Sequence, residues 1–172
     1  MYSLSIFNEI NMPLDWFIIY FCIEQNLFDP KIVDEYLVCK INSGNVLNDD
    51  ETDLLLLDSF EKEMVLIALG QLDDLSKNFD DNILIAKDKT KFAIIYHLRK
   101  YESNLSRLFM EIDNLYANFG YPEDMENFVS YMPIDKKISE NFQSHKDFEL
   151  NILKNIDKFL SVKSAGYLKV EN

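Results

Sequence analysis

Glycine and proline are both scarce in this sequence of 172 residues, with four of each. That scarcity excludes a fibrous or low-complexity chain, and it leaves too few glycines for the loops that cradle phosphates. With 48% hydrophobic and 27% charged residues, the composition is that of an ordinary globular protein. A chain of this length can bury roughly 70% of the surface that it exposes when unfolded. We therefore expect a single domain over residues 1–172.

Basic residues are also few, because 17 Lys and Arg oppose 30 Asp and Glu and give a net charge of −13. Such a charge argues against binding to nucleic acid or to an anionic membrane. The first basic residue is Lys31, so no positively charged stretch of a secretory signal is visible before it. The longest early apolar run, Trp16 to Ile23, is about half as long as a membrane span. We expect a cytoplasmic protein.

Histidine and cysteine are too rare for the common metal sites. His97 and His145 have no Cys or His neighbour at metal-ligand spacing, and the Asp49–Asp53 run lacks the central glycine and the closing glutamate of a calcium loop. Cys22 and Cys39 are expected to be buried thiols rather than a disulfide. The sequence therefore predicts no metal, no cofactor and no enzymatic activity, with a hydrolase that uses paired carboxylates as the enzymatic alternative.

Apolar residues recur at three- and four-residue spacing along most of the chain, which predicts helices. The clearest stripe covers residues 105–119, with Ser103 as its expected N-cap and Gly120 in the left-handed position past its end. A further helix is expected to begin at Pro122 and to stop at Pro133.

Start and stop signals of the same kind predict the other helices. Two helices are expected over 13–26 and 30–41, the latter capped by Asp29. Two more are expected to begin after an Asn48–Glu51 capping box and after a similar Asp58–Glu61 arrangement. A late helix is expected from Phe148 to an end at Gly166. The β-branched runs within 82–96 suit a hairpin, but we favour a helix over about 88–102. The predicted fold is all-α, an irregular single-domain bundle of about seven helices.

Negative charge is concentrated in two segments. Residues 49–81 carry eleven acids against two bases, and residues 108–135 carry six acids and no base. Acids at helix starts stabilise those helices by about 0.3–1 kcal/mol each, which accounts for only some of them. We predict two partner-binding surfaces. The first acidic face consists of Asp49, Asp50, Glu51, Asp53, Asp58, Glu61 and Glu63, and the second acidic face consists of Tyr121, Glu123, Asp124 and Glu126.

The segment Tyr116–Pro133, which reads YANFGYPEDMENFVSYMP, resembles the C-terminal signature of a bacterial family, domain of unknown function 2247. Pro13–Leu14–Asp15–Trp16 is a weaker match to the start of that family. The resemblance carries over no catalytic residue. It implies a likeness to the small acidic immunity proteins that bacteria encode beside polymorphic or contact-dependent growth-inhibition toxins, which are frequently basic nucleases.

Two functional hypotheses follow. The first is an immunity protein, monomeric, whose carboxylates attract a basic toxin domain and block its active site without chemistry. The alternative is a non-enzymatic regulatory or adaptor module that binds a host protein, or a second copy of itself, through an apolar helix face. The four leucines Leu54–Leu57 favour the alternative, because four consecutive side chains cannot all face one core.

Overall fold

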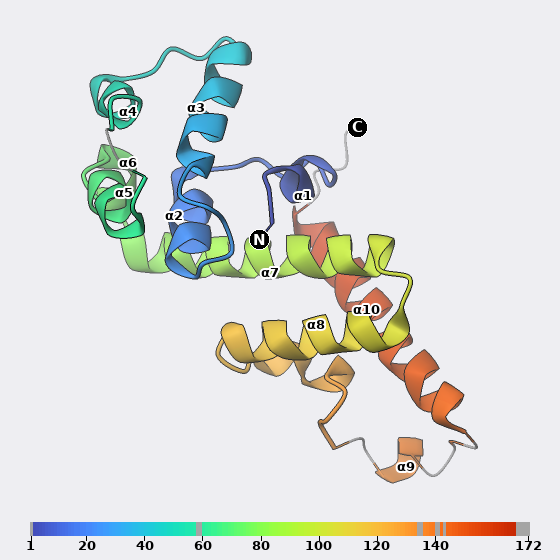
Figure 1. Ribbon diagram of the computed structural model, residues 1–172. Coiled ribbons are helices and arrows are strands. Elements are labelled where there is room, and N and C mark those ends of the chain that lie inside the picture. The colour runs from blue at the N-terminus through green and yellow to red at the C-terminus, as the bar shows by residue number, and fades with distance from the viewer. Residues whose placement is uncertain (1, 58–59, 134–135, 140–141, 143, 168–172) are drawn as a thin grey trace. The chain divides into compact units, whose positions relative to one another are not determined.

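The structure is a computed structural model that describes residues 2–57, 60–133, 136–139, 142 and 144–167 (Figure 1). Within these residues it contains ten α-helices and one 3-10 helix, and no strand. The predicted all-α class is confirmed, whereas the predicted count of about seven helices is too low. The hairpin alternative near 82–96 is wrong because that segment lies inside α7 (Phe79–Tyr101), a helix that also begins earlier than the expected residue 88.

The chain divides into two compact units whose boundary falls within α7: an N-terminal unit, Met1–Thr90, and a C-terminal unit, Lys91–Asn172. The single domain expected over 1–172 stays a prediction. The N-terminal unit contains, before α7, the helices α1 (Ser5–Asn8), α2 (Trp16–Glu24), α3 (Ile32–Asn42), α4 (Asp49–Leu54), α5 (Lys62–Leu69) and α6 (Asp73–Ser76).

Helix α2 forms the centre of the N-terminal unit, since most of its side chains are buried. Helices α5 and α6 pack against α2, and α4 packs against α3 (Figure 1). Asp15 caps α2 by accepting a 2.9 Å hydrogen bond from the backbone N–H of Ile18, so the helix begins at Trp16 rather than at Pro13. Helices α5 and α6 are separate because a turn at Gly70 interrupts the expected continuous stripe.

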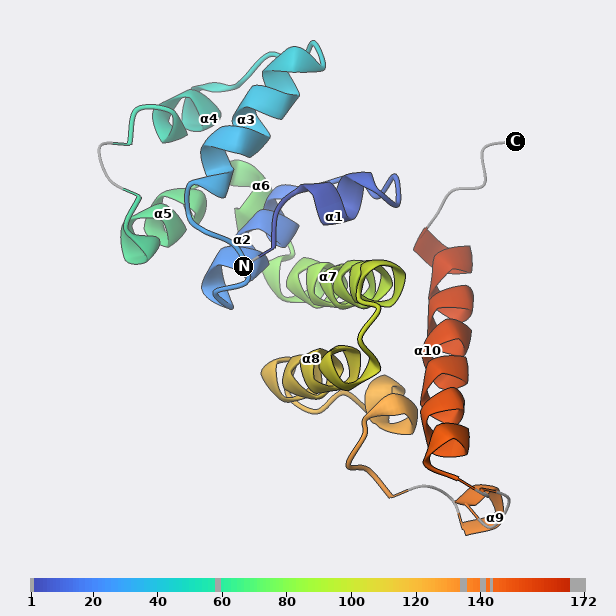
Figure 2. The same cartoon turned by 45° about the vertical axis from the view of Figure 1, so that its right-hand side comes forward.

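The C-terminal unit contains, after α7, the helices α8 (Leu105–Asn118), η1 (Glu123–Phe128, a 3-10 helix), α9 (Lys136–Ser139) and α10 (His145–Tyr167). Helix η1 lies against α10 (Figure 2). The apolar stripe of α8 is buried as predicted. The N-cap of α8 is Asn104 rather than Ser103, because the Asn104 side chain accepts a 3.0 Å hydrogen bond from the backbone N–H of Arg107.

The end of α8 has the backbone pattern of a Schellman motif. Gly120 has φ +77°, the left-handed conformation predicted for it, and Tyr121 follows with φ +60°. The N–H of Gly120 donates to the carbonyl of Ala117 at 3.1 Å, and the N–H of Tyr121 donates to that of Tyr116 at 2.9 Å. This turn places the ring of Tyr121 beside that of Tyr116, with centroids 5.3 Å apart.

Two further expectations differ from the structure. Gly166 lies within α10, which continues to Tyr167, so the predicted helix end there is wrong. Cys22 and Cys39 are both free thiols as expected, but only Cys22 is buried and Cys39 is exposed. Burial raises the pKa of the Cys22 thiol to about 12, which makes that thiol unreactive at neutral pH.

Gly120 and Gly166 provide a matched pair of alanine substitutions, because a Cβ added at either position meets no atom within 4 Å. Gly120→Ala should lower the free energy of unfolding by about 1–2 kcal/mol, since a left-handed backbone disfavours residues with a Cβ. Gly166→Ala should raise it by up to about 1 kcal/mol, since alanine favours helix. Urea unfolding followed by circular dichroism measures both, and shifts of the same sign would contradict the assigned backbone conformations.

Candidate functional site

The first acidic face is only partly a surface feature. Asp49, Asp50 and Asp53 of α4 are exposed, as are Glu61 before α5 and Glu63 within it. Asp58 lies outside the described residues. Asp49, Asp50, Asp53 and Glu63 form no ion pair with another residue in the described ranges. Their negative charges are therefore compensated only by solvent ions.

Exposed apolar side chains lie among these carboxylates. On α4, Asp49 and Asp53 share one helix face with Leu56 just beyond the helix end, and the Leu56 side chain is 72% exposed. On α5, Glu63 is followed by Met64 and Ile67, which are 51% and 65% exposed. A surface with both carboxylates and accessible apolar groups has the composition of a protein-binding site.

Glu51 does not belong to the exposed surface, in contrast to the prediction. It is only 3% exposed, and its carboxylate accepts a 2.8 Å hydrogen bond from the indole N–H of Trp16 on α2. The ammonium of Lys40 on α3 forms an ion pair with the same oxygen. The second oxygen completes the predicted capping box with Asn48. Glu51 therefore joins α4 to α2 and α3, and is not available to a partner.

The environment of Glu51 keeps its carboxyl ionised. Burial by itself raises the pKa of this carboxyl, but hydrogen bonds from Lys40, Trp16 and the Asn48 backbone, together with the Lys40 charge, lower the pKa below its ordinary value. Lys40 also lies over the Trp16 ring, with 5.6 Å between its Nζ and the ring centroid. The carboxylate, the ammonium and the indole thus form one structural cluster.

The second acidic face is similarly divided. Glu123, Glu126 and Tyr121 are exposed. Asp124 accepts hydrogen bonds of 2.7 Å from Lys91 to both of its oxygens, and Lys163 lies 3.4 Å away. The Lys91 side chain is only 7% exposed, so Asp124 neutralises a buried cation within the C-terminal unit and does not add negative potential to the surface.

Tyrosines extend the second acidic face. The tyrosine cluster consists of Tyr116, Tyr121 and Tyr131. Tyr116 is buried, whereas Tyr121 and Tyr131 are 63% and 58% exposed. The ring centroids of Tyr121 and Tyr131 lie 5.3 and 6.3 Å from that of Tyr116. Burial and the neighbouring Glu126 carboxylate raise the pKa of Tyr116. Desolvation and the charge of Asp113 raise the pKa of Tyr131. Carboxylates and aromatic rings therefore occupy one continuous surface of the C-terminal unit.

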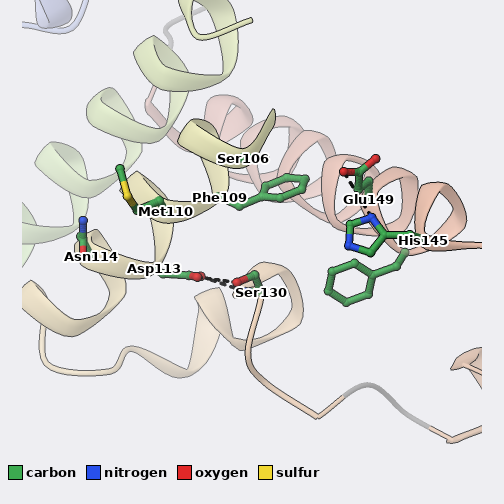
Figure 3. Close-up of a pocket in the computed structure, with 9 residues that line it drawn as sticks. Ser106, Phe109, Met110, Asp113, Asn114, Ser130, His145 and Glu149 are labelled. Atoms are coloured by element: carbon green, nitrogen blue, oxygen red, sulfur yellow. Dashed lines mark hydrogen bonds and ion pairs between the residues drawn. The ribbon is translucent and has the colours of Figure 1, made fainter. Parts of the chain in front are cut away.

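A groove of about 590 Å³ adjoins this surface. Its lining comes from α8, from the segment after η1 and from the start of α10, and we name it the α8–α10 groove: Ser106, Phe109, Met110, Asp113, Asn114, Ser130, His145, Phe148 and Glu149. Figure 3 shows the Asp113–Ser130 pair between Met110 and Asn114 on one side and the His145–Glu149 pair on the other, with Phe109 projecting between the two pairs.

Sequence reasoning missed this groove as a site. It counted Asp113 among the acids of residues 108–135 and rejected His145 as a metal ligand. It gave no reason to expect the two residues in one site. The outward stripe of α8, which runs from Ser106 through Met110 to Asn114 at four-residue spacing, is the one local signal of a shared face. The contribution of α10 depends on tertiary packing and has no such signal.

No group of three or more His, Cys, Asp or Glu side chains in the described ranges is arranged to hold a metal ion. In that same part of the chain, no helix combines the length and the apolar character that a membrane crossing needs.

The fold and these surfaces define an all-α protein that displays carboxylates and tyrosines. The chain belongs to the bacterial family described as "Uncharacterized protein conserved in bacteria (DUF2247)", which matches residues 4–164. The membership predicted from Tyr116–Pro133 is confirmed. No curated protein and no solved structure matches the chain.

Replacing Glu51 by glutamine tests the structural role of its charge. Because the pKa of Glu51 is lowered in the folded state, its stabilising contribution is present above the ordinary value of 4.5 and is lost as the pH falls through the lowered pKa. Glu51→Gln should lower the free energy of unfolding by about 1–3 kcal/mol at neutral pH, and by less in acid, as urea titrations measure. The control Asp50→Asn, on the exposed side of α4, should change it by less than about 0.5 kcal/mol. An equal loss for Glu51→Gln at both pH values would contradict this role.

Proposed function

We propose that this protein is an immunity protein, which binds a cognate bacterial toxin domain, a basic nuclease, and blocks its active site. One observation carries the proposal: the exposed carboxylates of α4 and α5 have no cationic partner within the described residues and lie next to exposed apolar side chains. As part of this proposal the protein is a cytoplasmic monomer, without a cofactor or an activity of its own, that binds neither nucleic acid nor membrane.

The physical basis is competition for a phosphate-binding surface. A nuclease collects cationic side chains where it contacts the nucleic-acid backbone. Carboxylates on α4 and α5 accelerate encounter with such a surface. Once docked, Leu56, Met64 and Ile67 supply apolar area from which water is displaced, which lowers the dissociation rate. Inhibition then results from occupancy of the active site.

The residues assigned to binding follow from exposure. On the first acidic face they are Asp49, Asp50, Asp53, Glu61 and Glu63, and on the second they are Tyr121, Glu123 and Glu126. Glu51 and Asp124 are excluded because internal cations neutralise them. Asp58 lies outside the described residues, and its assignment to the binding surface rests on the sequence alone.

Exposure of the leucine run favours the second candidate function, an adaptor module that binds through an apolar helix face. Leu54 is buried, but Leu55 and Leu56 are 39% and 72% exposed. Self-association through these side chains would produce a dimer whose population rises with protein concentration. Sedimentation analysis of the wild-type chain and of Leu56→Lys distinguishes the immunity function from an adaptor that self-associates, since only the self-associating adaptor requires a dimer that the substitution disrupts.

Charge reversal tests the immunity function. The quadruple variant Asp49→Lys, Asp50→Lys, Asp53→Lys and Glu63→Lys should abolish protection when co-expressed with the toxin domain encoded by the adjacent gene. With the purified proteins, the association rate constant at low salt should fall by about tenfold or more and lose its salt dependence. Growth curves and stopped-flow fluorescence measure these effects.

The control reverses four other exposed acids of the same unit, Asp73, Asp74, Asp80 and Asp81. It changes the net charge by the same amount and should retain most of the protection. Equal effects of both variants would assign the attraction to net charge alone, and no binding of the wild-type chain to that toxin domain would overturn the proposed function.

A further inference from the structure

The α8–α10 groove carries negative charge that its own lining does not neutralise. Its nine lining residues include two carboxylates, Asp113 and Glu149, and no Lys or Arg. Asp113 accepts hydrogen bonds only from Ser130 within the described residues, one from the backbone N–H at 2.8 Å and one from the hydroxyl at 2.5 Å. Both donors are neutral, so they orient the carboxylate and leave its charge in place.

The second carboxylate has a weak partner. Glu149 lies 3.4 Å from Nδ1 of His145, a histidine whose side chain is 81% exposed. The groove therefore holds two separate carboxylates and no Lys or Arg in its lining (Figure 3). A complementary occupant has to be a cation.

The two phenylalanines of the lining, Phe109 and Phe148, form an aromatic wall of the groove. Phe109 projects from α8 (Figure 3), and Phe148 and the half-exposed Met110 complete the apolar part of the lining. A guanidinium group is planar and weakly hydrated, so it stacks on aromatic rings and donates several hydrogen bonds in its plane to carboxylates. An ammonium group is strongly hydrated and loses more solvation in such a groove.

The position of the groove indicates that its occupant belongs to a protein. Asp113 lines the groove and neighbours Tyr131, and the rings of Tyr131 and of the exposed Tyr121 both lie against that of Tyr116. Exposed tyrosines are typical anchors of protein interfaces. The groove and the tyrosine cluster thus form one surface with the composition of an interface.

We propose that the α8–α10 groove receives an arginine side chain from the surface of a basic protein partner, with the guanidinium stacked on the aromatic wall and bonded to Glu149, while the Asp113 carboxylate adds negative potential farther along the groove. This inference rests on the proposed function in that the partner is the basic toxin domain. It extends the contact region of the C-terminal unit from the second acidic face into the groove, and it names a specific side chain to be recognised.

The test uses acetyl-arginine methylamide as the probe, titrated into the 15N-labelled full chain and followed by amide chemical shifts. The expected result is saturable shifts at Asp113, Ser130 and Glu149, with affinity about fivefold or more above that of the lysine analogue. The citrulline analogue, which has the same shape without the charge, should give no saturable shift. Equal binding of arginine and lysine probes, or of arginine and citrulline probes, would overturn the arginine assignment.

Variants assign the binding to the groove. Glu149→Gln removes one charge without touching the Asp113–Ser130 pair, and should weaken the arginine probe by about tenfold. Asp81→Asn, at an exposed acid outside the groove that is assigned to neither acidic face, should leave the affinity for the arginine probe unchanged. If both variants bind the arginine probe like the wild type, the groove is not the site.

The two proposals can fail separately. A chain that protects cells from the toxin domain but gives no shift with the arginine probe would refute the groove assignment alone. A chain that binds the probe in the groove but neither binds nor neutralises the toxin domain would refute the immunity function alone.

Discussion

The chain has only 17 Lys and Arg side chains with which to neutralise 30 Asp and Glu side chains. Lys40 neutralises Glu51, Lys91 neutralises Asp124, and Arg99 holds Asp157 with two hydrogen bonds of 2.8 and 3.1 Å. A buried charge is costly when it is unpaired. Cations are therefore placed where helices join, and the outward carboxylates of α4 and α5 are left with solvent.

The same imbalance distinguishes two kinds of carboxylate. Glu51, which is buried, and Asp124, which is partly exposed, each form an ion pair with an ammonium group and have structural roles. Asp113 is instead oriented by hydrogen bonds from the backbone N–H and the hydroxyl of Ser130. Neutral donors fix its geometry without cancelling its charge. A carboxylate that is both rigid and charged is pre-organised for a cationic partner, because binding then costs little conformational entropy.

Local features of the fold were predictable because their signals lie within a few residues. The Asn48–Glu51 capping box and the left-handed Gly120 are of this kind. The hairpin alternative for 82–96 followed β-branched propensity, which tertiary context overrides when a long helix can bury those side chains. Gly166 was taken as a helix end although glycine is tolerated inside an exposed helix.

The candidate sites were predictable only in part, for a reason of chain separation. The partner that buries Glu51 is Trp16, 35 residues away, and the cation that neutralises Asp124 is Lys91, 33 residues away. Contacts between residues so far apart along the chain produce no recognisable pattern in a single sequence. Charge density identifies the acidic segments in the sequence, whereas the exposure and the ion pairs of each individual acid depend on packing.

Trp16 has a practical consequence because it is the single tryptophan of the chain. Its indole N–H donates to Glu51 on α4, and Lys40 lies over its ring. Indole emission is sensitive to hydrogen bonding and to nearby charges, so the chain contains an intrinsic fluorophore placed at the junction of α2, α3 and α4. Its spectrum reports on the attachment of α4 without any added dye, and without a tryptophan signal from residues 91–172.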